Sequence, residues 1–307
     1  MAPPSLARCL KLLLCGLALE ALALEALALP ALAAQEAPAW APVTVPAAQQ
    51  RDLQSARTGH GYRIFMAVPA VAPPPEGYPV LYVLDGNAAF PVAAFLARSA
   101  ASRQEVTGHI PPLVVGIGYP GQQDFDVPAR RRDYTVGPGA PDSGGAGDFL
   151  DFLEQEVKPL VAATHPVDRR RQALFGHSFG GLLVTHALFT RPASFSTFLI
   201  SSPSIWWQDK VVLRNLPELL QSPTRPRVQI SVGALEDDPP KGNYPPEVRA
   251  LLAQRPMITE ARQLAATLGS TPGWEGRVAY HELAGEDHGP AWLPAMSRGM
   301  QFFLEQP

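Results

Sequence analysis

The segment 176–180, Gly-His-Ser-Phe-Gly, has the residue types and spacing of a catalytic serine. An apolar segment, 172–175, precedes it, and an apolar, helix-like stretch, 182–189, follows it. A serine between a strand and a helix sits in a sharp turn that presents its hydroxyl at the helix N-terminus. Glycines remove side chains that would clash there, and backbone N–H groups favour developing negative charge. A glycine-rich loop after a buried strand has a similar composition, but the flanking elements favour a nucleophile at Ser178.

A serine hydroxyl is a weak nucleophile and needs a base within hydrogen-bond reach, itself oriented by an acid. In the strand–turn–helix arrangement the chain order is serine, acid, histidine. His288 fits this order, since it follows the last predicted strand, 277–281, and precedes a predicted helix, 290–303. The alternative is a histidine of a surface loop. The remaining histidines have the wrong order or lie in predicted elements, and they are His60, His109, His165, His177, His186 and His281.

The acid that orients His288 has several candidates. Glu236, Asp237 and Asp238 follow the predicted strand 228–232, which precedes the histidine strand. Glu236 is favoured because it comes first after the turn, and Asp237 is second. Asp287 lies beside His288 in sequence. A Ser–His pair without an acid and a solvated acidic turn both remain open.

Hydrolysis of an ester also needs hydrogen-bond donors for the oxyanion of the tetrahedral intermediate. The N–H of Phe179 is one donor, because it follows the serine at the start of the helix. The loop after the third strand should supply another. That loop is 85–87, after the apolar run 80–84, and we assign the N–H of Asn87. An ordinary strand-terminal turn is the alternative.

Length and composition are those of one globular domain. The chain has 307 residues, 46% of them hydrophobic, and a formal net charge of −3, which gives no push toward nucleic acid or anionic membranes. Apolar runs alternate with helix-like segments, which predicts an α/β fold with a mostly parallel sheet covered on both faces. Residues 119–147 are predicted as a long irregular loop, and Phe149–Ala163 as a helix. We expect a loose lead-in at 34–58 and a single catalytic domain at 59–307.

The first 33 residues have the pattern of a secretory signal peptide. Arg8 and Lys11 form a basic start, 12–19 is apolar, and 31–33 is an Ala-x-Ala cleavage site. An earlier cut after Ala23 and an uncleaved amphipathic anchor are the alternatives. Both cysteines of the chain, Cys9 and Cys15, lie in this segment, so the mature protein has no disulfide and no thiol chemistry. We therefore expect a periplasmic or secreted protein without stable membrane insertion after cleavage.

Several motifs together resemble a known family. They are Leu-Tyr-Val-Leu-Asp-Gly at 81–86, Arg-Arg-Asp-Tyr-Thr at 131–135, Gly-His-Ser-Phe-Gly-Gly at 176–181, Ser-Ser-Pro-Ser-Ile-Trp-Trp at 201–207 and Val-Gly-Ala-Leu-Glu at 232–236. In this order they resemble the esterase D-type α/β hydrolases. Within that family the chain is most similar to periplasmic siderophore esterases that cut enterobactin and salmochelin trilactones. The likeness spans about residues 55–305.

The resemblance implies an α/β-hydrolase fold without a large cap domain and therefore an open cleft. It implies Ser178 as nucleophile, His288 as base, and Asn87 with Phe179 as oxyanion donors. It supports Glu236 as the acid, although in the siderophore esterases that residue is poorly placed or dispensable. The activity implied is hydrolysis of a carboxylic ester, with no cofactor and no metal.

The implied substrate, a ferric triscatecholate siderophore, is a bulky anion. Arg130, Arg131 and Arg132 on the predicted loop are candidates for charge-assisted contacts to it. Trp206 and Trp207 are candidates for packing against its aromatic rings. Solvated or ion-paired arginines and a core tryptophan are the alternatives. We expect a monomer; the rival functions are a general carboxylesterase for small acyl or aromatic esters and a catalytically silent binding protein of the same fold.

Overall fold

A computed structural model describes residues 40–305 except for 138–140, 239–241 and 244. The chain divides into a unit of Met1–Val43 and a unit of Thr44–Pro307, and every helix and strand below belongs to the second. The predicted signal peptide and its cleavage sites lie outside the described residues. Among the residues described, none of the helices has the length and apolar character needed to cross a membrane.

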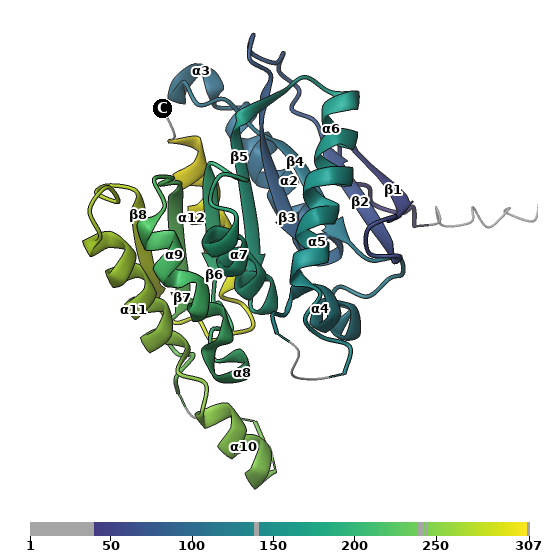
Figure 1. The fold of residues 1–307 in the computed structure, drawn as a ribbon. Coiled ribbons are helices and arrows are strands. Elements are labelled where there is room, and N and C mark those ends of the chain that lie inside the picture. Colours follow the sequence, from purple (N-terminus) through teal and green to yellow (C-terminus); the bar gives the residue numbers. More distant parts are fainter. Residues whose placement is uncertain (1–39, 138–140, 239–241, 244, 306–307) are drawn as a thin grey trace, which may run out of the picture. The chain divides into compact units, whose positions relative to one another are not determined.

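The described part of the second unit is built on an eight-stranded sheet in the order β1-β2-β4-β3-β5-β6-β7-β8 (Figure 1). The β1–β2 and β2–β4 pairs are antiparallel, and all later pairs are parallel. The strands are β1 (Ala48–Gln54), β2 (Gly61–Ala67), β3 (Tyr78–Leu84), β4 (Leu113–Gly118), β5 (Val167–His177), β6 (Thr197–Ser201), β7 (Arg227–Gly233) and β8 (Val278–Leu283). The prediction of a mostly parallel sheet is confirmed.

Helical segments connect the strands. They are α2 (Gly86–Ala101), α3 (Gln104–Thr107), α4 (Val127–Tyr134), α5 (Ala146–Phe152), the π-helical η2 (Leu153–Val157), α6 (Lys158–Thr164), α7 (Phe179–Thr190), α8 (Trp207–Lys210), the 3₁₀-helical η3 (Val211–Asn215), α9 (Leu216–Gln221), α10 (Pro246–Ala253), α11 (Met257–Ser270) and α12 (Trp292–Leu304). The helix predicted over 149–163 is therefore a run of α5, η2 and α6.

The central strands of the sheet are buried on both faces, as their apolar sequences predict. In β3 every residue is buried, and successive side chains point to opposite faces. Tyr82 and Leu84 pack in a core with residues of α5, α7, α9 and α11. Leu81 and Val83 pack in a second core with residues of α2 and α12. The two cores hold the central strands rigidly, which fixes the positions of the loops at their ends.

Two predictions about the chain's organisation are wrong. The lead-in predicted at 34–58 contains β1, which pairs along its whole length with β2, so the ordered domain begins earlier than residue 59. The loop predicted at 119–147 contains α4. Asp126 caps α4 by accepting a hydrogen bond from the Ala129 N–H at 3.0 Å, and Pro128 lies in its first turn. An N-cap aspartate followed by a first-turn proline is a helix-start signal. The glycines on either side of this short helix nevertheless gave the whole region the composition of a loop.

The loops that follow β3, β4, β5, β6, β7 and β8 carry the predicted functional residues. In an open sheet of this type, ligands bind outside the carboxyl ends of the parallel strands.

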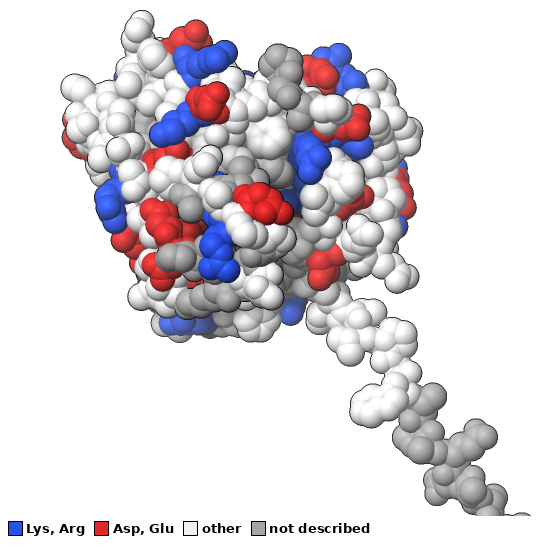
Figure 2. Space-filling model, turned by 90° about the horizontal axis from the view of Figure 1, so that it is seen from below, with Lys and Arg blue, Asp and Glu red and all other residues white. Residues whose placement is uncertain are grey.

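The helices α4, α8 and α10 lie at the lower end of the view in Figure 1. Figure 2, which views the molecule from below, shows acidic and basic side chains interspersed over a mostly uncharged surface. This face therefore presents no broad field of one sign.

Candidate active site

Ser178 sits in a strained turn between β5 and α7. Its backbone has φ 60° and ψ −117°, which a residue with a side chain rarely adopts. The turn is tight enough that a Cβ on Gly176 would lie 2.4 Å from the carbonyl oxygen of Gly180. The Ser178 N–H donates to the carbonyl of Ser201 at 3.0 Å. The strand and helix thus hold the serine at the carboxyl end of the sheet, as the glycine spacing predicts.

His288 reaches Ser178 from the loop after β8. Its Nε2 lies 3.0 Å from the Ser178 Oγ, and 45% of its side chain is exposed. A base in this position can take the hydroxyl proton during attack and later return it to a leaving group. The two residues are 110 positions apart in sequence. The parallel pairing of β5, β6, β7 and β8 brings their loops to the same edge.

Glu236 lies on the far side of the histidine ring. Its Oε2 is 2.7 Å from the His288 Nδ1, and its side chain is completely buried. Its Oε1 accepts the Gly233 N–H at 2.6 Å and the Ser202 hydroxyl at 2.5 Å. An accepting carboxylate at Nδ1 leaves Nε2 unprotonated and free to serve as the base.

The other acidic candidates have different partners. Asp237 is exposed, and its Oδ1 accepts the Ile258 N–H at 3.1 Å. Asp287 is exposed, and its Oδ1 accepts the Gly289 N–H at 3.1 Å. Of the candidates among the described residues, the structure thus puts Glu236 against His288.

The two predicted oxyanion donors lie at the starts of two helices. Phe179 is the first residue of α7 and Asn87 the second of α2, and the first N–H groups of a helix have no intrahelical partner. The Asn87 side chain is tied to Tyr119, accepting its N–H at 2.9 Å and donating to its carbonyl at 3.0 Å. A Cβ at Gly118 would lie 2.0 Å from the Asn87 Oδ1, so this packing requires glycine there. These contacts hold the start of α2 against the loop after β4.

Comparison with known proteins assigns the chain to a family. The sequence matches the family described as "Putative esterase" over residues 55–296. The chain belongs to this esterase family. It is 32% identical to the ferri-bacillibactin esterase BesA of Bacillus subtilis over 85% of this chain and 91% of that protein. It is 34% identical to the siderophore enterobactin esterase of Emericella nidulans over 72% of this chain and 80% of that protein.

A solved structure supports the same assignment. The crystal structure of the BES protein from Bacillus cereus superposes with a TM-score of 0.77 at 31% identity, covering 88% of this chain and 99% of that one. The α/β-hydrolase fold and the resemblance to siderophore esterases, both predicted from the motifs, are confirmed.

The three arginines of the esterase that were candidates for substrate contacts differ in their surroundings. Arg130 is buried, and its Nε donates to the Asp85 Oδ1 at 2.7 Å. Its Nη2 also donates to the carbonyl of His177 at 3.3 Å. Arg132 donates from Nε to the Asp133 Oδ1 at 2.7 Å, whereas Arg131 is exposed. They lie on α4 and not on a loop; only Arg131 and, in part, Arg132 are open to an anionic ligand.

The buried Asp85–Arg130 pair links the loop after β3 to the serine turn. Asp85 has φ 54° and directly precedes α2, and its N–H donates to the Tyr134 hydroxyl at 3.3 Å. Burial raises the pKa of Asp85, and the charge and hydrogen bonds of Arg130 act in the opposite direction. The Arg-Arg-Arg run at 130–132 gives no sign in the sequence that its three side chains have different surroundings. Its α4 position, with Ala129 and Arg130 on the buried face, was the missing information.

The two tryptophans are half-buried and lie beside Phe179, which follows Ser178. The ring of Trp207 meets that of Phe179 edge to face at 5.2 Å between centroids, and its Nε1–H donates to the carbonyl of Val136 at 3.1 Å. Trp206 lies 6.3 Å from the Phe179 ring, and the Arg255 guanidinium lies 4.1 Å from its centroid. The pair therefore forms an aromatic cluster adjoining the turn that carries Ser178.

His177 and Ser202 contribute to the site but were not selected from the sequence. The His177 ring centroid lies 4.8 Å from that of His288, and its Nδ1 lies 3.0 Å from the Ser201 Oγ. Burial lowers the pKa of His177 well below 6.5, which keeps this ring neutral. Both serines fall in the Ser-Ser-Pro motif at 201–203 that carried part of the family resemblance, so that motif was the available signal.

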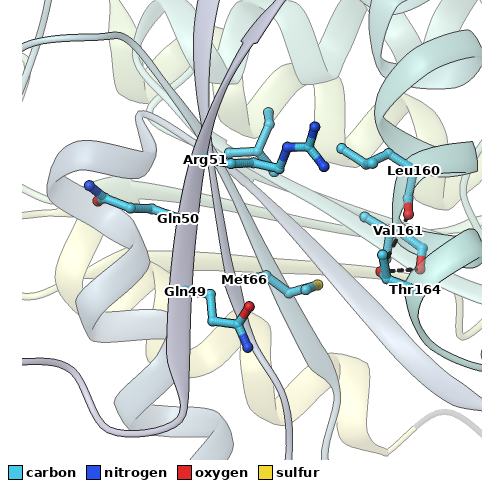
Figure 3. Close-up of a pocket in the computed structure, with 8 residues that line it drawn as sticks. Gln49, Gln50, Arg51, Met66, Leu160, Val161 and Thr164 are labelled. Carbon is cyan, nitrogen blue, oxygen red and sulfur yellow. Dashed lines mark hydrogen bonds between the residues drawn. The ribbon is translucent and has the colours of Figure 1, made fainter.

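Two cavities of the described residues lie away from Ser178. A cavity of about 110 Å³ between β1, β2 and α6 is lined by Arg51, Met66 and Leu160 among others (Figure 3). A larger one of about 320 Å³ lies beside Lys158 and Gln172. Neither is lined by Ser178, His288 or Glu236. Within the described residues, no group of three or more His, Cys, Asp or Glu side chains could hold a metal ion.

Proposed function

We propose that this protein is a serine esterase that uses Ser178, His288 and Glu236. The observation that carries the proposal is the unbroken series of contacts from Glu236 through both ring nitrogens of His288 to the hydroxyl of Ser178. The strained backbone of Ser178, at the start of α7, supports the same role.

The reaction follows from these contacts. The Ser178 Oγ attacks the ester carbonyl while the His288 Nε2 takes its proton, and the buried Glu236 carboxylate stabilises the imidazolium that forms. The N–H groups of Phe179 and Asn87 stabilise the oxyanion. His288 then protonates the leaving alcohol. A water molecule, activated by His288 in the same way, releases the acid from the acyl-enzyme.

The proposed substrate is a siderophore ester of the trilactone class. Two similar proteins are named as esterases of bacillibactin and enterobactin, and they match most of this chain. The exposed Arg131 and part-exposed Arg132 could contact anionic groups of a ferric catecholate, and Trp206 with Trp207 could pack against its rings. We do not include Arg130 in this role, because its guanidinium is buried against Asp85.

We further propose that the protein acts after export, in the periplasm or outside the cell, as a monomer without a metal or cofactor. The signal-like pattern of residues 1–33 supports export. A cysteine-free mature chain suits any redox environment.

Mass spectrometry of the products of a trilactone siderophore tests the proposal. Purified protein incubated with enterobactin should yield the linear trimer and shorter fragments, and Ser178→Ala should leave the trilactone intact. An intact trilactone together with rapid hydrolysis of p-nitrophenyl acetate would instead identify a general carboxylesterase. No hydrolysis of either compound would identify a silent binding protein of the same fold.

A further inference from the structure

Ser202 makes a contact that the proposed mechanism does not yet use. Its hydroxyl donates to the Glu236 Oε1 at 2.5 Å, and both side chains are completely buried. We propose that Ser202 is a positioning residue, which holds the Glu236 carboxylate in the orientation that His288 requires. This inference rests on the proposed esterase function.

The two oxygens of Glu236 have separate tasks. Oε2 faces the His288 Nδ1 at 2.7 Å, while Oε1 receives both the Ser202 hydroxyl and the Gly233 N–H. One contact would leave the carboxylate free to rotate about its terminal torsion, which is broad for glutamate. Two donors on Oε1 fix the carboxylate plane and therefore the direction of Oε2. They also satisfy an oxygen that burial has removed from water.

The turn that carries Ser202 also holds the nucleophile. Ser202 follows β6, and its N–H donates to the carbonyl of Ser231 on β7 at 2.8 Å. Its neighbour Ser201 accepts the Ser178 N–H at 3.0 Å, and Ser204 donates its N–H to the carbonyl of Ser178 at 3.2 Å. A single rigid turn thus sets both the main chain of the nucleophile and the side chain of the acid. The distance between Ser178 and the Glu236 carboxylate is therefore fixed in the absence of substrate.

The backbone of Ser202 makes a selective test available. Its φ is 42°, in the left-handed region that glycine adopts without strain. Ser202→Gly removes the hydroxyl and suits the backbone, while Ser202→Ala removes only the hydroxyl. A matched control is Ser231→Ala, because Ser231 is equally buried but its hydroxyl contacts Gln229.

The first measurement is the steady-state hydrolysis of p-nitrophenyl acetate. We expect kcat to fall about 10- to 100-fold in both Ser202 variants, as for a catalytic group displaced by about an ångström, with KM changed less than about twofold. Ser231→Ala should keep kcat within about twofold. Circular dichroism and the urea midpoint of each variant establish that it is folded.

The second measurement asks whether Ser202 acts through Glu236. If it does, adding Ser202→Gly to Glu236→Gln should slow the enzyme no more than about twofold further, because the carboxylate is already lost. Wild-type kcat in Ser202→Gly, or losses that multiply in the double variant, would overturn the proposal.

A third readout needs no substrate and so separates this inference from the proposed function. The low-field proton resonance of the His288 Nδ1–H should be present in the wild type and in Ser231→Ala. It should be lost or shifted in Ser202→Gly and in Glu236→Gln. An unchanged resonance in Ser202→Gly contradicts the positioning role even if the protein hydrolyses no ester. Failure of the wild type to hydrolyse any ester would count against the proposed function alone.

Discussion

Two buried carboxylates lie on either side of Ser178, and they differ in the partners they hold. Glu236, after β7, faces His288, whose side chain is 45% exposed. Asp85, after β3, faces Arg130, whose side chain is only 10% exposed. Both lie at the carboxyl ends of parallel strands, and both accept short contacts of 2.7 Å from nitrogen.

The partner decides what each carboxylate can do. Arginine stays charged throughout the ordinary pH range, so the Asp85–Arg130 pair exchanges no proton and can only hold structure. An imidazole ring can accept and return a proton at one nitrogen while the other donates to a carboxylate, so the Glu236–His288 pair can take part in proton transfer. Of the two pairs, only Glu236–His288 has the groups needed for proton transfer, as the proposed mechanism requires.

Replacing Glu236 should have the largest effect, which is a loss of catalytic rate. Glu236→Gln keeps the shape of the side chain but removes its charge, and it should lower kcat by about 10²- to 10⁴-fold. The larger figure matches the asparagine substitution in the serine-protease triad, a standard worked case. Steady-state kinetics on p-nitrophenyl acetate measure it, with the exposed Asp237→Asn as control. A loss below about tenfold would indicate a Ser–His dyad.

Breaking the structural pair should cost stability. Arg130→Met leaves Asp85 buried without its partner, and the free energy of unfolding should fall by about 3–5 kcal/mol. The double change Asp85→Asn with Arg130→Met should recover much of this loss, because no isolated charge remains. Urea unfolding measures both. A loss below about 1 kcal/mol in Arg130→Met would show that the pair contributes little to the fold.

His186, on the helix α7 that follows Ser178, should make the protein less stable at acidic pH. Burial lowers the pKa of His186 on α7 to about 4, with the charge of Arg191 adding to the shift. The unfolded chain binds a proton on this histidine near pH 6.5, whereas the folded protein binds it only near pH 4. The contribution of the neutral ring to stability is therefore complete above about pH 6.5 and is lost as the pH falls toward 4. His177 titrates in the same direction.

Urea unfolding at pH 7.5 and pH 4.5 tests this account. The wild type should lose on the order of 2–3 kcal/mol to His186 over that range, and His186→Gln should remove that part of the loss. The exposed His60→Gln is the control and should behave as the wild type does. An equal pH dependence in His186→Gln and the wild type would contradict the assignment.

The smallest effect concerns the exposed arginine next to the structural pair. Arg131→Gln should raise KM for an anionic siderophore by about two- to fivefold at low salt, and the difference should shrink in 0.5 M NaCl. KM for neutral p-nitrophenyl acetate should not change. An equal effect on both substrates would rule out a charge contact by Arg131.

The sequence predicts the candidate residues Ser178, His288 and Glu236 better than it predicts the buried Asp85–Arg130 pair. Ser178 and His288 follow strands whose order along the chain is also their order in the sheet, so their loops lie at the same edge of the sheet. Glu236 is favoured for the same reason, although the choice over Asp237 depends on the turn geometry around Gly233. Strand periodicity and glycine spacing carry this information directly.

Arg130 shows why the buried ion pair is harder to predict. Its burial follows from α4, an eight-residue helix whose start signal at Asp126 is local, while its partner Asp85 lies 45 residues earlier. Ser202 is similar, since its role depends on a carboxylate 34 residues later. Such contacts depend on tertiary packing, and no pattern within either segment indicates them.

Covalent labelling with a fluorophosphonate probe tests the central claim most directly. The probe reacts with a serine only where a base and oxyanion donors activate it. Peptide mass spectrometry should find one adduct per chain, on Ser178, and none in Ser178→Ala. In His288→Ala the labelling rate should fall by at least about 10³-fold. No adduct on the folded wild type, or an adduct on a different serine, would contradict the account.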